Sequence, residues 1–265
     1  MAHARLVIIG GGNMGTALVG GLVHGGWDAS TITVVEIDAA KRSALESDFG
    51  VRTSDHLVAA DGALIAVKPA DALAVCSQLA AHGVPRILSI AAGISVDSLQ
   101  DAAGSSTAVV RAMPNTPALV REGVTALCGS SSCTEDDFQW AESLMAAVGI
   151  VVRVPESQMD AVTAVAGSGP GYLFLVAESL LDAARAEGLP DHIANTLVRQ
   201  LFRGAGILLA ESHESPATLR ERVTSPNGTT AAGLAQFEDA GLREIVKKAV
   251  RAAAQRSAEI GSAKS

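Results

Sequence analysis

A tight glycine turn between an apolar strand and a helix is the feature that most constrains how this chain can fold. Residues 6–9 read Leu-Val-Ile-Ile, and Gly10-x-Gly12-x-x-Gly15 follows at once. Glycine tolerates the backbone angles of such a turn and lets a phosphate approach the start of the next helix. In this context the turn predicts a βαβ unit that binds a dinucleotide; a plain strand–helix turn is the alternative.

Apolar strands and helices continue to alternate up to Pro155. Helices are predicted over residues 13–24, 39–48 and 70–82, with a further helix capped by Thr134. The other strands are expected at residues 32–35, 63–67, 86–90, 108–111, 124–127 and 150–154. Strands that are apolar throughout are typical of a parallel sheet covered on both faces. The pattern predicts a Rossmann-type doubly wound α/β domain over residues 1–155.

Beyond Pro155 the strand pattern stops, and Ala/Leu/Glu/Arg-rich helical segments run as far as Ile260. We therefore expect a second, all-α domain over residues 156–265. The segment from Ala161 to Ile207 is unusually apolar for helices on the outside of a small domain. Such a surface is expected to be buried against a second copy of the chain, which predicts a homodimer through the helical domain.

Charge and composition disfavour several classes of partner. The chain has 20 basic and 28 acidic residues, a net charge of −8 and 3% aromatic residues, which disfavours nucleic acids and anionic membranes. No apolar run is expected to reach the length of a membrane span, and strand-like residues directly after Arg5 leave no room for a leader segment. Cys76, Cys128 and Cys133 lack metal-ligand spacing, so we expect free thiols, no metal site and a cytoplasmic protein.

Glu36 bears on the choice of nucleotide. It lies at the end of the second predicted strand, 21 residues after Gly15. An acid there can accept hydrogen bonds from a ribose hydroxyl and repels a 2′-phosphate, which favours NADH. Lys41 and Arg42 lie close enough in sequence to soften that repulsion, so NADPH remains open. An exposed acid without a role in cofactor binding is the alternative.

Several other loops follow predicted parallel strands and should lie at the same edge of the sheet, where open α/β folds bind ligands. Two prolines, Pro114 and Pro117, make the loop around Asn115 rigid. Ordinary loop chemistry is the alternative for each of these loops. The predicted cofactor-binding residues are Gly10, Gly12, Asn13, Met14, Gly15, Glu36, Ala66, Val67, Lys68, Pro69, Ala92, Gly93 and Asn115.

A second turn, Ser-Pro-Asn-Gly-Thr-Thr at residues 225–230, leads into a helix late in the chain. Its small residues, free backbone N–H groups and hydroxyls are suited to holding a carboxylate, with help from the helix dipole. Pro226 fixes the backbone and Gly228 lets it approach a ligand. The alternative is a routine Ser/Thr/Asn helix cap.

Five motifs, taken in order, resemble the pyrroline-5-carboxylate reductase family. They lie at residues 9–15, 66–69, 113–117 with 120–123, 167–172 and 223–230, so the resemblance covers nearly the whole chain. The pattern Ser-Pro-x-Gly-x-Thr at residues 225–230 is the most specific of them. Glu36 departs from the family pattern, because NADPH-preferring members often have a small or basic residue there. The departure leaves the choice between NADH and NADPH open.

The resemblance implies reduction of a cyclic imino acid, 1-pyrroline-5-carboxylate, to L-proline by hydride transfer from NADPH or NADH, without a metal or a covalent nucleophile. It also implies that Thr230 is catalytic, its hydroxyl facing the ring nitrogen. Separately, the position of Ser168 at the start of the long helix predicts that it caps this helix. Family members form dimers through interleaved helices, and such dimers can assemble into rings. The implied substrate-binding residues are Ser225, Asn227, Gly228, Thr229 and Thr230.

Two other classes of protein share parts of this pattern. β-Hydroxyacid dehydrogenases of the same two-domain plan place an acid/base lysine on the long interdomain helix, and residues 172–186 contain no lysine. A different imine reductase would fit the same plan. A non-catalytic dinucleotide sensor would have no need of a carboxylate-binding turn, so Ser225, Gly228 and Thr230 favour an enzyme.

Overall fold

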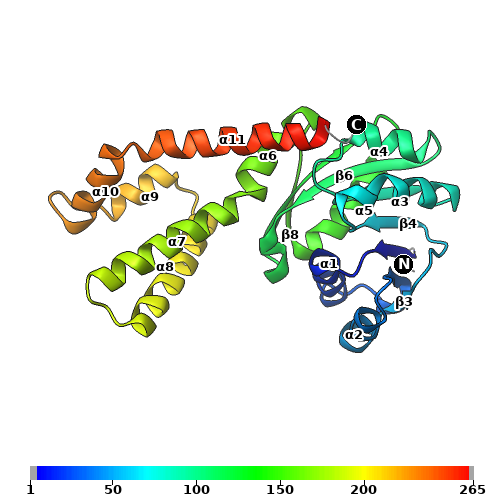
Figure 1. Cartoon of the computed structure of the whole chain (residues 1–265), viewed down its shortest axis with the longest axis horizontal. Helices are drawn as coiled ribbons and strands as arrows, with labels where there is room; N and C mark the ends of the chain where they lie inside the picture. Colours follow the sequence, from blue (N-terminus) through cyan, green and yellow to red (C-terminus); the bar gives the residue numbers. More distant parts are fainter. Residues whose placement is uncertain (1–4, 263–265) are drawn as a thin grey trace. The chain divides into compact units, whose positions relative to one another are not determined.

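The computed structural model describes residues 5–262 and has two compact units. The first unit comprises Met1–Ser168 together with Ala253–Ser265, and the second comprises Gly169–Ala252 (Figure 1). The sheet ends just before Pro155, where we placed the domain boundary, but the first compact unit continues to Ser168. The expectation that the N-terminus has no room for a leader segment concerns residues 1–4 and lies outside the described residues.

Within residues 5–262, eight strands form one sheet in the order β3-β2-β1-β4-β5-β6-β7-β8. They are β1 (Leu6–Ile9), β2 (Ile32–Val35), β3 (Arg52–Ser54), β4 (Gly62–Ile65), β5 (Arg86–Ser89), β6 (Ala108–Pro114), β7 (Gly123–Gly129) and β8 (Gly149–Arg153). This order confirms the predicted doubly wound, Rossmann-type sheet. The sequence pattern missed β3, since its three residues are polar and lie at one edge of the sheet.

Two strands, β7 and β8, run opposite to the other six described strands. The predicted parallel arrangement holds from β3 to β6 but not at β7, which pairs antiparallel with β6, with Met113 opposite Ala126; β8 pairs parallel with β7. The connection between the two strands spans residues 115–122 and contains only the short helix η2 (Thr116–Val120). A parallel pairing would need a crossover of a dozen or more residues, so this short connection dictates the antiparallel direction.

The helices of the first unit cover both faces of the sheet. They are α1 (Asn13–His24), α2 (Ala39–Phe49), α3 (Pro69–Ala81), α4 (Val96–Ala103), α5 (Glu135–Met145) and α6 (Met159–Val162), with the short turns η1 (Ala29–Thr31), η3 (Ala146–Val148), η4 (Glu156–Gln158) and η5 (Thr163–Gly167). The predicted helices are present, and α4 is an addition to them. Thr134 caps α5 through a reciprocal capping box with Asp137, as its sequence indicated.

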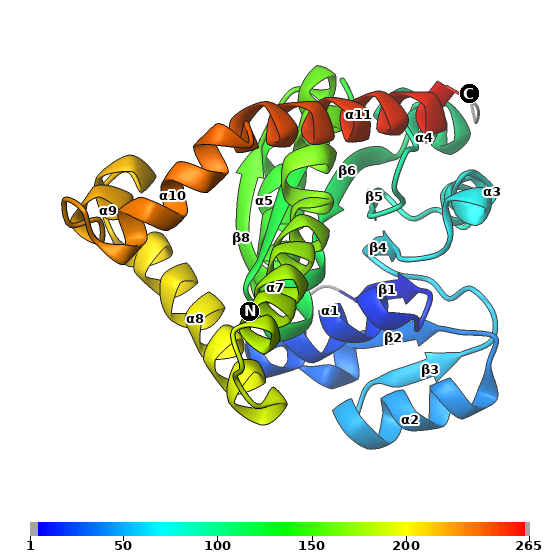
Figure 2. The same cartoon turned by 60° about the vertical axis from the view of Figure 1, so that its left-hand side comes forward.

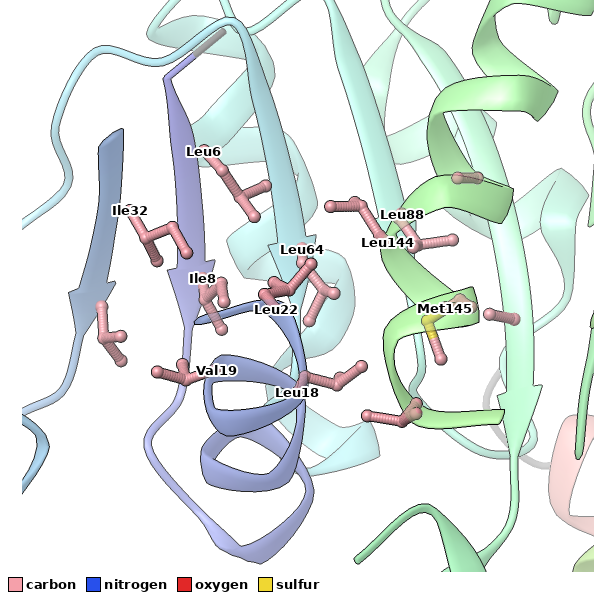
Figure 3. Packing of buried hydrophobic residues seen from close by; sticks show 14 of the residues in the cluster. Leu6, Ile8, Leu18, Val19, Leu22, Ile32, Leu64, Leu88, Leu144 and Met145 are labelled. Carbon is pink, nitrogen blue, oxygen red and sulfur yellow. The ribbon is translucent and has the colours of Figure 1, made fainter. Parts of the chain in front are cut away.

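Alternate residues of β1 face opposite layers of the core, as the two-residue period of a strand requires. Leu6 and Ile8 pack with residues of α1 and α5, whereas Val7 and Ile9 pack with residues of α3 and α4. Figure 3 shows the first of these layers, in which Leu18, Val19 and Leu22 of α1 lie against the sheet. Each such fully buried side chain contributes about 1.5–3 kcal/mol to folding.

The second unit is helical, and in both views its first two helices lie side by side (Figures 1 and 2). Its helices are α7 (Gly169–Ala186), α8 (Asp191–Glu211), α9 (Pro216–Arg222), α10 (Thr229–Asp239) and the greater part of α11 (Leu242–Ser262). This all-α region confirms the predicted fold class for the C-terminal part of the chain.

The helical path enters α7 without a break. Ser168 was expected to cap α7, but its backbone is helical (φ −86°, ψ −21°) and its N–H donates to the Thr163 carbonyl at 2.8 Å across a π turn. The expectation was wrong because a capping residue needs an extended backbone.

A long apolar helical run results from this continuity. By length and composition alone, Glu156–Ala186 could cross a membrane, with a mean hydropathy of 1.3 and only 6% of its most apolar window buried. The prediction that no apolar run approaches that length was therefore wrong. The π turn η5 joins α6 to the stretch that leads into α7, so the apolar run extends beyond either helix alone.

The last turns of α11 belong to the first unit. The Ser257 hydroxyl donates to Asp160 Oδ1 at 2.7 Å, and Ser257 is buried. Ile260 lies against the loop after β5, where a Cβ on Gly93 would be 2.6 Å from Ile260 Cγ2. These contacts explain why the end of α11 belongs to the first compact unit although the rest of the helix belongs to the second.

An ion pair between a buried arginine and a partly buried glutamate joins the start of the helical region to the sheet. The Arg111 side chain on β6 is only 5% exposed and pairs with the Glu156 carboxylate on η4. Glu156 also accepts a hydrogen bond from the Cys128 thiol on β7 at 2.7 Å. Burial, and then this contact with Glu156, raise the pKa of the Cys128 thiol far above its ordinary value, so the thiol stays protonated.

We predict that Glu156→Gln lowers the free energy of unfolding by about 2 kcal/mol, because it leaves the buried Arg111 charge without a counter-ion. Urea denaturation followed by circular dichroism measures the loss. Glu135→Gln is a matched control, since Glu135 pairs with Arg153 on the exposed surface and its loss should change the midpoint little. Equal shifts of the urea midpoint in the two variants would show that the Arg111–Glu156 pair stabilises the fold no more than an exposed pair.

Candidate functional site

Parallel strands β2, β1, β4 and β5 end level with one another. Ile9 pairs with both Val35 and Ile65, and Ile65 pairs with Ser89. The first residue after each strand continues the ladder through backbone hydrogen bonds of 2.8–3.0 Å: Gly10 N–H to Val35, Glu36 N–H to Ser54, Ala66 N–H to Ile9 and Ile90 N–H to Ile65. Four predicted cofactor segments, the loops after β1, β2, β4 and β5, therefore begin at one edge of the sheet. That edge includes the point between β1 and β4 where the strand order reverses.

The glycine turn is packed too tightly for other residues at two positions. Gly10 has φ +107°, and a Cβ on it would lie 2.6 Å from the Ala66 carbonyl oxygen. A Cβ on Gly15 would lie 2.1 Å from the Gly10 carbonyl oxygen. A Cβ on Gly12 would meet no atom within 4 Å among the described residues. Gly12 therefore borders open space at the start of α1.

The N-terminus of α1 offers unpaired donors to that space. Gly12 is the N-cap residue, and the hydrogen-bond ladder begins with Thr16 N–H donating to the Gly12 carbonyl at 2.8 Å. The N–H groups of Asn13, Met14 and Gly15 thus have no intrahelical partner, and no side chain of the described region caps the helix. Such a helix end binds phosphate.

Glu36 follows β2, and its side chain is hydrogen-bonded to the glycine turn. Its Oε2 accepts a hydrogen bond from Gly11 N–H at 2.9 Å, and its Oε1 accepts one from Asp38 N–H at 3.0 Å. Partial burial raises the pKa of this carboxyl, but the two N–H donors and the positive charge of Lys41 outweigh burial, so the pKa lies below its ordinary value. Glu36 is therefore ionised at neutral pH.

The loop after β4 supports the turn from the side. The Ala66 carbonyl lies against Gly10, and the exposed Lys68 is the N-cap residue of α3, with Pro69 at its first position. Proline suits this position because its missing N–H would have no partner there. This loop adds one cationic side chain to the rim of the edge.

The loop after β5 contains Ala92, which is exposed, and Gly93, which has φ +73°. Both residues line a cavity of about 270 Å³ within the first unit, together with Thr163, Ser168, Ser257 and Ile260. The loop therefore borders a hollow that α11 closes on one side.

Asn115 makes two side-chain hydrogen bonds to the backbone that its sequence position did not reveal. Its Nδ2 donates to the Ala166 carbonyl at 3.1 Å, and its Oδ1 accepts from Val124 N–H at 2.9 Å. The side chain thus holds the start of β7 near η5. Its assignment to the cofactor site remains a prediction.

The second predicted turn has the same construction as the first. Gly228 is the N-cap residue of α10, and the ladder begins with Ala232 N–H donating to the Gly228 carbonyl at 3.1 Å. The N–H groups of Thr229, Thr230 and Ala231 therefore have no intrahelical partner, and no described side chain caps this end. The alternative of a routine Ser/Thr cap does not apply to this helix.

Gly228 lies close against Ser225 within this second turn. A Cβ on Gly228 would lie 2.3 Å from Ser225 Oγ. Asn227 has φ +60°, a left-handed conformation that asparagine tolerates better than most residues. Ser225, Thr229 and Thr230 are exposed in the described chain. The turn therefore presents three hydroxyl-bearing residues and a helix N-terminus to solvent.

Gly11 was missed as a site residue. It occupies a variable position of the Gly-x-Gly-x-x-Gly pattern, so the pattern alone gives no reason to single it out. A Cβ on Gly11 would lie 3.2 Å from Glu36 Oε2, and glycine allows this close approach. Within residues 5–262, no group of three or more His, Cys, Asp or Glu side chains is arranged to hold a metal ion.

Two parts of the chain match known families. Residues 156–260 match the family described as pyrroline-5-carboxylate reductase dimerisation, and residues 5–93 match the family described as NADP oxidoreductase, coenzyme F420-dependent. The chain is 40% identical to the pyrroline-5-carboxylate reductase of Pseudomonas aeruginosa, with 98% of each chain covered. It is 41% identical to that of Synechocystis, with 97% of this chain and 98% of the relative covered.

Solved structures agree with these sequence matches. A pyrroline-5-carboxylate reductase from Coxiella burnetii superposes with a TM-score of 0.92 at 36% identity, covering 97% of this chain and 98% of that one. The pyrroline carboxylate reductase of Plasmodium falciparum, solved with NADP bound, superposes with a TM-score of 0.84 at 27% identity. The superposition covers 98% of this chain and 99% of that one.

Two glycine substitutions should separate folding from binding. Gly15→Ala forces a Cβ against the Gly10 carbonyl, so we expect both a lower melting temperature and lost NADH binding. Gly12→Ala adds a methyl group to open space at an ordinary φ of −74°, so we expect near-normal stability but much weaker NADH binding. Thermal unfolding and fluorescence titration measure the two quantities. Full NADH affinity in Gly12→Ala would contradict phosphate binding at α1.

Proposed function

This chain belongs to the pyrroline-5-carboxylate reductase family, and we propose that it reduces 1-pyrroline-5-carboxylate to L-proline with NADPH or NADH. The observation that carries the proposal is the uncapped N-terminus of α10, which begins within the family's Ser-Pro-x-Gly-x-Thr pattern. A dinucleotide site alone would fit many oxidoreductases. A second site built for a small carboxylate narrows the substrate to an acid.

The glycine turn fits a dinucleotide. The N–H groups of Asn13, Met14 and Gly15 would hold its pyrophosphate, since Gly12 leaves the approach open. Glu36 would receive its adenosine ribose, and the loops at residues 66–69 and 92–93 would border the remainder. When bound, the nicotinamide cofactor supplies the hydride for the reaction.

The turn at residues 225–230 would hold the substrate carboxylate. The N–H groups of Thr229, Thr230 and Ala231 converge at a helix N-terminus, where the dipole favours a negative charge. The Ser225 hydroxyl lies beside Gly228 and adds a further donor. Asn227, in its left-handed conformation, turns the backbone so that these donors lie together.

Thr230 would act on the reacting ring. Its hydroxyl forms no hydrogen bond to another described residue, so it is available to the ring nitrogen of the substrate. A protonated imine is already electrophilic, and addition of a hydride to its carbon converts the nitrogen to a neutral amine. A hydroxyl can donate or accept a hydrogen bond, so Thr230 can stay bonded to this nitrogen as its charge changes.

The helical region supports assembly into a homo-oligomer, in agreement with the dimerisation family that it matches. We propose that a homodimer buries its exposed apolar faces, which would also account for the membrane-like composition of residues 156–186. A ring of dimers and a cytoplasmic location, where the cysteines stay reduced, are part of the same proposal. The exposed apolar residues of α7 and α8 include Leu173, Phe174, Leu175, Leu197, Leu201 and Leu208.

The purified protein should oxidise NADH or NADPH on addition of pyrroline-5-carboxylate, in the presence of a chelator and without added metal. Absorbance at the reduced-nicotinamide band follows the reaction, and chromatography identifies proline as the product. A linear ketoacid and a β-hydroxyacid serve as controls. Turnover of either control, with none of the cyclic imine, would refute the assignment.

Thr230→Ala should lower kcat/KM by roughly ten- to a hundredfold, because the ring nitrogen loses its hydrogen-bond partner. Stability should change little, since the hydroxyl does not cap α10. Thr230→Ser keeps the hydroxyl and should retain most of the activity. Ser225→Ala should mainly raise KM, as expected of a carboxylate contact. Full turnover by Thr230→Ala would remove this residue from the mechanism.

A further inference from the structure

We propose that this chain is selective for NADH over NADPH, because the Glu36 carboxylate is fixed against the glycine turn where the adenosine ribose would bind. The inference deepens the proposed function and rests on it for the reaction. The family match to an NADP oxidoreductase and the relative solved with NADP point the other way. The selectivity would therefore set this chain apart from those proteins.

The carboxylate is held at both oxygens. Gly11 N–H donates to Oε2 and Asp38 N–H donates to Oε1, so rotation away from the turn would break both hydrogen bonds. A Cβ on Gly11 would lie 3.3 Å from Glu36 Cγ and 3.0 Å from Leu45 Cδ1. Glycine at position 11 therefore allows Glu36 and Leu45 to close on the turn from one side.

The hydrogen-bond acceptor capacity that remains on the Glu36 carboxylate suits a diol. Each carboxylate oxygen can accept about two hydrogen bonds, and each already accepts one from the backbone. The 2′- and 3′-hydroxyls of NADH are two donors, which match the two acceptor positions that are left. A 2′-phosphate is an anion that offers mainly acceptors, so a fixed carboxylate would repel it without any compensating hydrogen bond.

The neighbouring cations, Lys41 and Arg42, are balanced by nearby acids, and Arg42 is also hydrogen-bonded to the backbone. Arg42 Nη1 donates to the carbonyl oxygens of Glu36 at 2.7 Å and Ile37 at 3.0 Å, which braces the turn between β2 and α2. Lys41 lies close enough to Glu36 to lower its pKa. With Glu36 and Asp38 opposite Lys41 and Arg42, no net positive charge remains here to bind a dianionic phosphate.

The exposed Ile37, next to Glu36, also suits the binding of a nucleoside. Its side chain is 88% exposed, the highest value among the large apolar residues of the described chain, and it directly follows Glu36. Arg42 holds its carbonyl, so the residue is exposed on an ordered turn. An apolar side chain in this position can pack against the adenine ring of either cofactor. It should add affinity without selectivity.

Titrations of NADH and NADPH, without the imine, test the proposal. Nicotinamide fluorescence should give a dissociation constant at least roughly tenfold lower for NADH than for NADPH in the unmodified protein. Glu36→Gln keeps the shape and removes the charge, and should shift the ratio toward NADPH by roughly tenfold. Ile37→Ser is the control that should weaken both cofactors alike.

Three results would overturn the proposal: equal affinities in the unmodified protein, an unchanged ratio in Glu36→Gln, or a selective loss of NADPH binding in Arg42→Met. The last would show that Arg42 binds the 2′-phosphate, whereas a brace should affect both cofactors. Cofactor selectivity without imine reduction would refute the proposed function alone. Imine reduction with equal use of both cofactors would refute the selectivity alone.

Discussion

The level ends of four parallel strands are the constraint on which the cofactor site depends. Because Ile9 is in register with both Val35 and Ile65, the loops after β1, β2 and β4 start side by side. A shift of one residue in the pairing of β1 with β2 would move Glu36 away from the Gly11 N–H that fixes it, and a shift in the pairing of β1 with β4 would move the Ala66 carbonyl away from Gly10. The buried, alternately facing residues of β1 resist such a shift, since it would turn them toward the wrong layer.

Each unit contains a helix whose N-terminus leaves backbone donors free, as the proposed anion sites require. Helices α1 and α10 each have glycine as the N-cap residue, with extended backbone angles and with three N–H groups left unpaired by the described residues. Helices α2, α4, α5 and α9 instead have side-chain caps from Asp38, Ser95, Thr134 and Ser215. Helices α3 and α8 also lack a side-chain cap, but there Lys68 and Pro190 are the N-cap residues, whereas glycine at α1 and α10 places no side chain beside the free donors.

The sequence predicted the elements better than their connections. Apolar runs identified the buried strands and the motifs identified both turns, because these features are local. The direction of β7 depends on the length of the loop before it, and apolar composition carries no such information. The compact unit continues past Pro155 because of contacts far apart in sequence, such as that of Ser257 with Asp160. Gly11 could not be singled out for the same reason, since its role depends on Glu36.

Backbone donors also shape how such a site would respond to pH. The N–H groups at α1 and α10 do not titrate, so their capacity to bind pyrophosphate or carboxylate stays constant across the physiological range. Glu36 has a lowered pKa and remains ionised above the acidic range, so the ribose contact proposed for it would be constant as well. The Thr230 hydroxyl does not ionise there either. Of the groups assigned to the reaction, the ring nitrogen of the substrate is then the one whose protonation changes, and the reactive imine carries its own proton into a site that need only orient it.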